Sequence, residues 1–118
     1  MDPTKFAVLV TSDSFMATPF IDCMRFIKAA LQLGHQIDMV FLYQQSVYAA
    51  LAEPDLPSDE PDLAGQLATL CQTHQIPLLY CATAAEKRGV SQVRAGYTLA
   101  GLAEFGMRLA TVDKLVQF

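Results

Sequence analysis

Cys81 has the clearest potential for chemistry among the side chains of this sequence. It closes a short apolar run at residues 78–81, and the small and charged residues that follow at 82–88 predict a helix ending at Gly89. In open α/β sheets, ligands and reactive groups gather at the carboxyl ends of strands. The amide groups at the start of a helix, with their partial positive charge, favour the thiolate over the thiol. This placement suits a sulfur-handling nucleophile.

The other two cysteines have a simpler interpretation. Cys23 belongs to the apolar stripe of a predicted helix, and Cys71 shares a helical face with Leu67 and Leu70. Because buried free cysteine commonly behaves as a small hydrophobic residue, we predict that both are core residues.

For Cys81, the local sequence leaves a reactive and a structural interpretation open. The last residue of a central strand is often covered, but the small side chains at 82–85 predict an uncrowded thiol. No two cysteines have the C-x-x-C spacing, and His35 and His74 are isolated from them. We therefore expect free thiols and no metal site.

Length and composition limit the class of protein. A chain of 118 residues predicts one domain, residues 1–118, with a sizeable core. No apolar run reaches the length of a membrane span, and no cationic and apolar leader opens the chain. We therefore expect a cytoplasmic protein and attribute its 53% hydrophobic content to subunit interfaces. The net charge of −4 and the scattered basic residues argue against nucleic-acid binding.

Strand-like apolar segments alternate with helix-like segments along the chain. Strands are predicted at residues 5–10, 37–43, 78–81 and 115–118, and helices between Thr18 and Gly34, at 62–73, at 82–88 and at 98–106, with a short helical turn at 48–51. Thr18 is the expected N-cap, with Pro19 at the first helical position. In the last helix, Leu99, Leu102 and Ala103 are expected to face the core. This alternation predicts βαβ crossovers and an α/β fold, an open three-layer sandwich with a mainly parallel central sheet.

Polar loops and aromatic side chains provide weaker candidates. The loop at residues 11–14 occupies the position where flavodoxins bind phosphate, but it lacks their glycines, so we expect a solvated connection. Asp13 in this loop is a candidate acid or base, although an ordinary loop aspartate is the simpler interpretation. Tyr43 and Tyr48 could line a cleft or an interface. The acidic loop at residues 53–62 is expected to be solvated or to present charge to a partner.

Five segments of the chain together resemble the DsrE-like sulfurtransferase family. They read FAVLVT, VFLYQQSVY, SDEPDL, LLYCATAAEKRGV and LATVDKLVQF, and their order and spacing cover nearly the whole sequence. The most specific pieces are the cysteine followed by a small-residue helix ending in K-R-G-V, and the terminal V-Q-F. Within the family, the chain is most similar to a sulfur-relay branch.

The resemblance implies a function for Cys81. In the family, the matching cysteine carries a persulfide, accepting sulfane sulfur from a donor protein and passing it to an acceptor carrier protein. The sulfur-relay branch supplies sulfur for 2-thiouridine formation in tRNA, whereas relatives use the same cysteine in sulfur oxidation. The branch assembles with homologous subunits into a heterohexamer, other members act as homo-oligomers, and no metal or organic cofactor takes part.

One departure from the family pattern lies close to Cys81. Gly89 and Val90 are joined to Gly96 by residues 91–95 alone, a shorter segment than in the sulfur-relay branch. Because loops near a site often set partner choice, the donor and acceptor stay open. A non-catalytic subunit of the same architecture is an alternative function. A flavodoxin-like or receiver-like binding module is less favoured, since a receiver needs an aspartate where this chain has Cys81.

Overall fold

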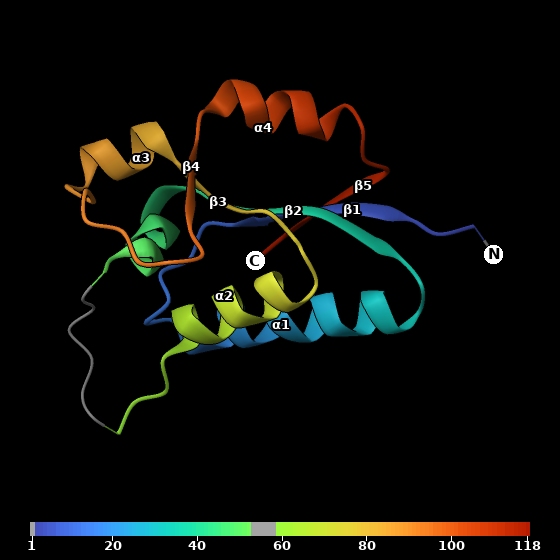
Figure 1. The fold of residues 1–118 in the computed structure, drawn as a ribbon, viewed down its shortest axis with the longest axis horizontal. Coiled ribbons are helices and arrows are strands. Elements are labelled where there is room, and N and C mark those ends of the chain that lie inside the picture. The colour runs from blue at the N-terminus through green and yellow to red at the C-terminus, as the bar shows by residue number, and fades with distance from the viewer. Residues whose placement is uncertain (1, 53–58) are drawn as a thin grey trace.

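Five parallel strands form the centre of the structure, a computed structural model that describes residues 2–52 and 59–118 (Figure 1). The strands are β1 (Lys5–Val10), β2 (Gln36–Leu42), β3 (Leu78–Cys81), β4 (Thr98–Ala100) and β5 (Lys114–Gln117). Their order across the sheet is β4-β3-β2-β1-β5, and every neighbouring pair is parallel. The predicted α/β sandwich with a parallel sheet is therefore confirmed.

The central strands are apolar on both faces, as strands covered by helices must be. In β2, the last four residues, Met39 to Leu42, are completely buried. In β3 all four residues are buried. The edge strands differ, because β5 has no buried residue and β4 has only Ala100.

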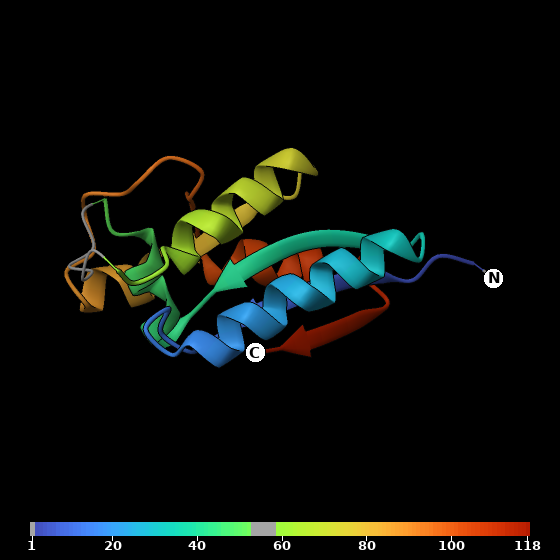
Figure 2. The same cartoon turned by 90° about the horizontal axis from the view of Figure 1, so that it is seen from below.

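Helices cover both faces of the sheet (Figures 1 and 2). On one face lie α1 (Ala17–Gln32) and α2 (Leu63–Thr73), and on the other lie α3 (Ala82–Lys87) and α4 (Leu102–Leu109). A 3₁₀ helix, η1 (Gln44–Ala50), extends the helical turn predicted at 48–51. Within the two described ranges, no helix has both the length and the apolar character needed to cross a membrane.

The first helix starts earlier than the sequence predicts. Met16 is its N-cap, so Thr18 and Pro19 lie inside the first turn, and the predicted cap is wrong. The predicted stop is confirmed, since Gly34 has a positive φ of 85° and the amide of His35 donates to the carbonyl of Ala30. Glycine suits this position because the left-handed backbone conformation carries no steric penalty there.

The predicted helix at 98–106 is wrong in its first part. Residues 98–100 form β4, which pairs with β3, and Gly101 then caps α4. Leu99, Leu102 and Ala103 were expected to face the core, but all three are exposed. The three-residue strand depends on pairing with a distant segment, which helical spacing within 98–106 could not reveal.

Candidate functional site

Cys81 lies where a strand ends and a helix begins, as the sequence predicts. It is the last residue of β3 and the N-cap residue of α3. In the sheet it pairs with Ala100 of β4, while its predecessor Tyr80 pairs with Leu42 of β2. The thiol therefore belongs to the carboxyl edge of the sheet, between the ends of two neighbouring strands.

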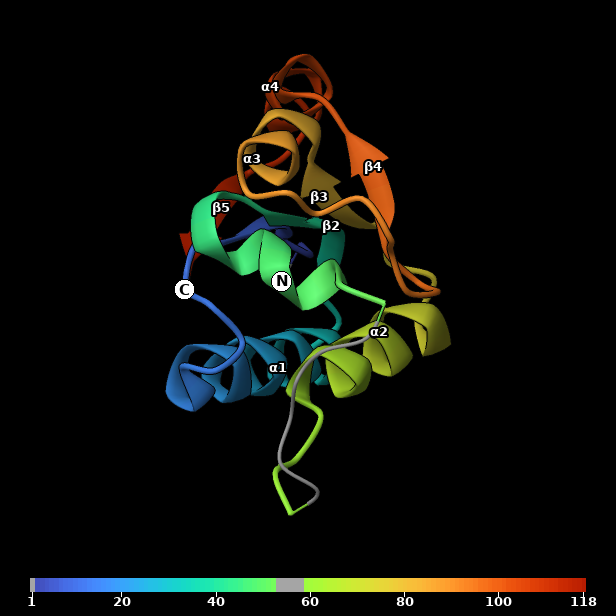
Figure 3. The ribbon, with the colours of Figure 1, turned by 90° about the vertical axis from the view of Figure 1, so that its left-hand side faces the viewer.

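The prediction of an uncrowded thiol at Cys81 is wrong, because its side chain has 0% exposure. η1 crosses the carboxyl edge of the sheet between the two helix layers (Figure 3), and it contacts both β3 and α3. Small buried residues stand on both sides of this contact, namely Ala84 and Ala85 in α3 and Ala49 and Ala50 in η1. Small side chains let two segments approach closely, which is consistent with the packing of η1 against α3 next to Cys81.

The start of η1 is fixed by a buried hydroxyl. Ser46 is completely buried, and its Oγ lies within hydrogen-bonding distance of the carbonyl oxygens of Val10 and Tyr43. Gln44, at the first position of η1, has a positive φ of 56°, a conformation that is uncommon outside glycine. These contacts fix the turn that leads out of β2 into η1.

The end of η1 is fixed by the segment after α3. We call residues 91–95 the strap; the family resemblance predicts that this segment is shorter than in the sulfur-relay branch. The Ala52 amide donates to the Gln92 carbonyl at 2.9 Å, and the Arg94 amide donates to the Ala50 carbonyl at 2.9 Å. Leu51 and Val93 form an isolated antiparallel bridge between these two hydrogen bonds. The strap therefore pairs with the residues that close η1.

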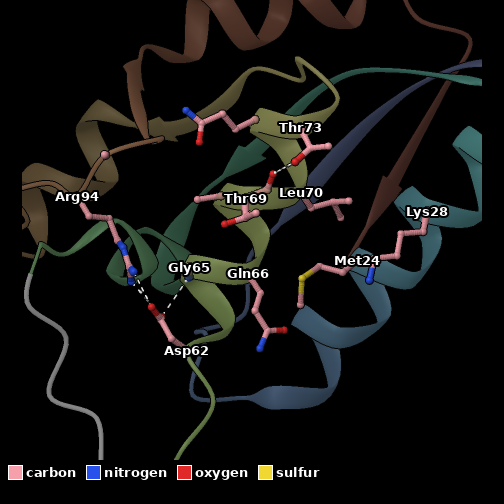
Figure 4. A pocket seen from close by; sticks show the side chains of 12 residues that line it. Met24, Lys28, Asp62, Gly65, Gln66, Thr69, Leu70, Thr73 and Arg94 are labelled. Carbon is pink, nitrogen blue, oxygen red and sulfur yellow. Dashed lines mark hydrogen bonds and ion pairs between the residues drawn. The ribbon is translucent and has the colours of Figure 1, made fainter.

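A bidentate ion pair fastens the strap to α2 (Figure 4). The Arg94 guanidinium donates to the two carboxylate oxygens of Asp62 at 3.0 and 2.6 Å. Asp62 is also the N-cap of α2 and accepts from the Gly65 amide at 3.1 Å. The hydrogen bonds from Arg94 lower the pKa of Asp62 below its ordinary value, and the Gly65 amide adds to this effect while partial burial opposes it.

The same ion pair lies at one end of a groove of about 780 Å³ beside α2. Figure 4 shows Asp62 and Arg94 at one side of the groove and Met24 and Lys28 of α1 at the other. The lining is of mixed polarity and contains none of the three cysteines. The groove therefore has no direct connection to thiol chemistry.

Cys23 and Cys71 lie on α1 and α2, with 0% and 1% exposure. Burial, with a smaller contribution from the Cys71 thiol, raises the pKa of Cys23 to about 12. Burial likewise raises the pKa of Cys71 to about 12. Both are thiols at neutral pH, and the prediction that they are core residues is confirmed.

The weaker sequence candidates serve local structure. The Asp13 carboxylate accepts from the Phe15 amide at 3.1 Å within its own loop. His35 accepts from the Thr4 amide at its Nδ1 atom, and His74 is the C-cap residue of α2. Most of the acidic loop, residues 53–58, lies outside the described residues.

Sheet topology separates Cys81 from the usual ligand crevice of open α/β sheets. That crevice forms where the strand order reverses, which in this sheet is between β1 and β5. Cys81 ends β3, which is separated from β1 by β2. Cys81 therefore lies two strands away from the position where such folds usually bind a ligand.

Sequence analysis did not identify Ser46, Asp62 or Arg94 as parts of the site. Asp62 and Arg94 are 32 positions apart, and Ser46 is 36 positions from Val10. No spacing rule links residues so distant. The acidic N-cap position of Asp62 was the one available signal, and it indicated a helix start and nothing about the strap.

Comparison with known proteins identifies the family. The model of the DsrE/DsrF-like family matches residues 4–118. This chain belongs to the DsrE/DsrF-like family. The resemblance found in the sequence is therefore confirmed over nearly the whole chain.

Two relatives within the family carry the same name. The Sulfurtransferase TusD of Enterobacter sp. (strain 638) is 31% identical over 127 aligned positions, covering 97% of this chain and 99% of the relative. The Sulfurtransferase TusD of Pectobacterium carotovorum subsp. carotovorum (strain PC1) is 29% identical, with 97% and 98% covered. Because each alignment has more positions than this chain has residues, each relative has residues without a counterpart here.

A solved structure supports the fold. The crystal structure of the ychN protein from E. coli superposes with a TM-score of 0.81 at 19% identity, covering 98% of this chain and 99% of that one. At this identity, the likeness concerns the fold alone.

Proposed function

We propose that this chain is a sulfurtransferase subunit of a sulfur relay, with Cys81 as the catalytic residue. The observation that carries the proposal is the placement of Cys81 at a strand end and helix start in a chain that is related to a named sulfurtransferase over 97% of its length. Cys23 and Cys71 are poor alternatives, because burial raises the pKa of each to about 12 and both lie within the helix layer. A persulfide carrier needs a thiolate.

The proposed reaction is thiol exchange applied to a persulfide. The Cys81 thiolate attacks the outer sulfur of a donor persulfide, forming a new S–S bond while the donor S–S bond breaks and the donor leaves as a thiolate. An acceptor thiolate then attacks the outer sulfur of the Cys81 persulfide and releases the Cys81 thiolate. Each step exchanges one S–S bond for another, so no external oxidant or reductant is needed.

The partners in this proposal are a sulfur donor protein, an acceptor carrier protein and homologous subunits. In this proposal, the relay supplies sulfur for 2-thiouridine formation in tRNA. Persulfide transfer in sulfur oxidation is the alternative pathway. Exposed large apolar side chains support subunit association; they include Leu99, Leu102, Met107 and Leu115 on β4, α4 and β5. The strap is the feature most open to partner-specific variation, because it contacts the segment that covers Cys81.

One observation favours a second candidate, a non-catalytic subunit of the same architecture. Cys81 has no exposed surface, as expected for a structural core cysteine. The two functions differ in whether the Cys81 thiol ever becomes accessible in the folded chain.

Persulfide loading separates the two functions. The chain is incubated with a donor persulfide, and the added sulfur is mapped by intact mass and peptide mass spectrometry. The sulfurtransferase proposal expects label on Cys81, loss of that label in Cys81→Ala, and retained label in the control variants Cys23→Ala and Cys71→Ala. Label that persists in Cys81→Ala, or a Cys81 that resists both loading and alkylation in the native chain and its complexes, would refute it in favour of the non-catalytic subunit.

A further inference from the structure

The segment that packs against the end of β3 and the start of α3 buries few large apolar side chains. We call residues 44–52 the lid. Its helix η1 is a 3₁₀ helix, whose hydrogen-bond geometry is poorer than that of an α-helix. Val47 is the one large apolar side chain of the lid that is fully buried, since Ala49 and Ala50 are small and Tyr48 and Leu51 are only partly buried against the core. Segments with few buried apolar contacts open locally at lower free energy than the core does.

The lid has one firm end and one end that depends on the strap. Ser46 holds the firm end through the carbonyls of Val10 and Tyr43. The other end is held by two backbone hydrogen bonds to the strap, and the strap is held by the Arg94–Asp62 pair. A continuous chain of contacts therefore leads from the start of α2 to the covering of Cys81.

We propose that the lid is a gate for Cys81 and that the Arg94–Asp62 ion pair controls how often it opens. In the closed state, which is the state of this structure, the buried thiol is inaccessible to donor and acceptor persulfides. Release of the ion pair frees the strap, the lid separates from the strap at residues 50–52, and the thiol becomes reachable. The biological role of this gate rests on the proposed function. The gate itself is a statement about the accessibility of the Cys81 thiol, which can be measured without sulfur transfer.

Alkylation of Cys81 by iodoacetamide in the folded, full-length chain measures the gate without any sulfur transfer. Where opening is fast relative to alkylation, the rate follows the population of the open form. Asp62→Asn removes the carboxylate but keeps an N-cap side chain for α2, and Arg94→Gln removes the other partner. We expect each variant to speed Cys81 alkylation about two- to fivefold, the effect of losing a partly exposed ion pair. The double variant is expected to match the single variants, because both act through one contact.

A matched control is provided by Glu104→Gln. It removes one negative charge from the Arg108–Glu104 pair on α4. This pair lies outside the chain of hydrogen bonds that joins α2, the strap and the lid. Its Cys81 alkylation rate should equal that of the parent chain. An equal increase of the Cys81 alkylation rate in Glu104→Gln and Asp62→Asn would overturn the gate, since a general loss of stability of the folded chain would then explain both.

Locking the lid gives the opposite test. Leu51 and Val93 are antiparallel partners flanked by the two hydrogen bonds, the non-hydrogen-bonded arrangement in which Cα atoms lie about 4.5 Å apart. This separation allows a disulfide. In the oxidised variant Leu51→Cys/Val93→Cys, the rate of Cys81 alkylation should fall at least about tenfold. Reduction of the engineered disulfide should restore the rate.

The outcomes separate the gate from the proposed function. Sulfur accepted on Cys81 at an unchanged rate in the locked chain would overturn the gate and leave the sulfurtransferase proposal standing. Alkylation rates that follow the gate, without any sulfur accepted on Cys81, would support the gate and refute the sulfurtransferase proposal. Unchanged alkylation in Asp62→Asn, Arg94→Gln and the locked chain together would overturn the gate outright.

Discussion

The two helix layers of this protein differ sharply in how much side-chain surface they bury. In the first layer, α1 buries five residues and α2 buries four. In the second layer, α3 buries only Ala84 and Ala85, and α4 buries none. The first layer therefore supplies most of the packing. The second layer is thinner, and α4 is held by contact of Phe105 with Phe41 of β2 and by the ion pair of Arg108 with Asp38.

The position of Cys81 gives this difference its functional meaning. Cys81 caps α3 of the thin layer, whereas Cys23 and Cys71 lie in the packed layer. All three thiols are buried in the structure. The proposed gate implies that exposing Cys81 costs less free energy than exposing Cys23 or Cys71. Under that proposal, separation of the lid exposes Cys81 by local opening, whereas a thiol in the packed layer is exposed only by disruption of the core.

The largest expected effect tests the packing of the two layers directly. Ile27 on α1 has 0% exposure and Met107 on α4 has 74%. Ile27→Ala should lower the free energy of unfolding by about 2–5 kcal/mol through lost burial and a cavity. Met107→Ala should change it by about 0.5 kcal/mol or less. Denaturant titration measures both, and equal losses would remove the distinction between the layers.

The next effect concerns the attachment of α4. Asp38 on β2 is an ion-pair partner of Lys5 at 3.5 Å and of Arg108 at 3.3 Å, and its side chain is only 13% exposed. Asp38→Asn should lower the free energy of unfolding by about 1–2 kcal/mol, because two charge-assisted contacts are lost while water still reaches the cations. Glu104 is the more exposed ion-pair partner of Arg108, and Glu104→Gln should lower the free energy of unfolding by about 0.5 kcal/mol or less. A chemical denaturation series in low and high salt compares them, and a negligible loss in Asp38→Asn would show that packing alone holds α4.

The pH dependence of stability tests the packed layer through its cysteines. The folded pKa of Cys71 is about 12 against an ordinary value of 9.0. Because the folded pKa is raised, the unfolded chain loses its Cys71 proton at lower pH than the folded chain does. The contribution of Cys71 to the free energy of unfolding is therefore complete below pH 9 and is lost as pH rises from about 9 towards 12. Replacing the thiol by Cys71→Ala should therefore remove about 1 kcal/mol of the decline in unfolding free energy between about pH 8 and 10. Met107→Ala serves as the control with an unchanged slope, and an identical slope in Cys71→Ala would contradict the burial of its thiol as the cause.

The smallest effect sharpens the description of the packed layer at the end of α2. Gln75 follows this helix with a positive φ of 57°, and the Ile76 amide donates to the Cys71 carbonyl at 2.8 Å. Gln75→Gly should raise the free energy of unfolding by up to about 1 kcal/mol, since glycine adopts this conformation without strain. In the mirror experiment, Gly34→Ala should lower it by about 1 kcal/mol, because a Cβ there meets no neighbour and only the backbone is strained. Thermal unfolding resolves the two shifts, and the same sign for both would contradict the argument.

Sequence reasoning worked best where local pattern and final structure have the same cause. β1 and β3 have the predicted bounds, because a continuous apolar run is what a strand covered on both faces requires. The end of α1 was also predictable, since Gly34 supplies a conformation that other residues adopt at a cost. For the candidate site, the sequence placed Cys81 correctly at a strand end and helix start.

The sequence by itself determined the parallel α/β sandwich and the chemical identity of its candidate nucleophile, because periodicity, helix ends and residue type are local properties. Only the tertiary structure decided that residues 98–100 pair as β4, that η1 packs against β3 and α3, the two elements that meet at Cys81, and that Arg94 meets Asp62. Each of these depends on contacts between segments far apart in the chain. The accessibility of a thiol is a property of such contacts, since it depends on what folds over the sulfur and not on the residues beside it.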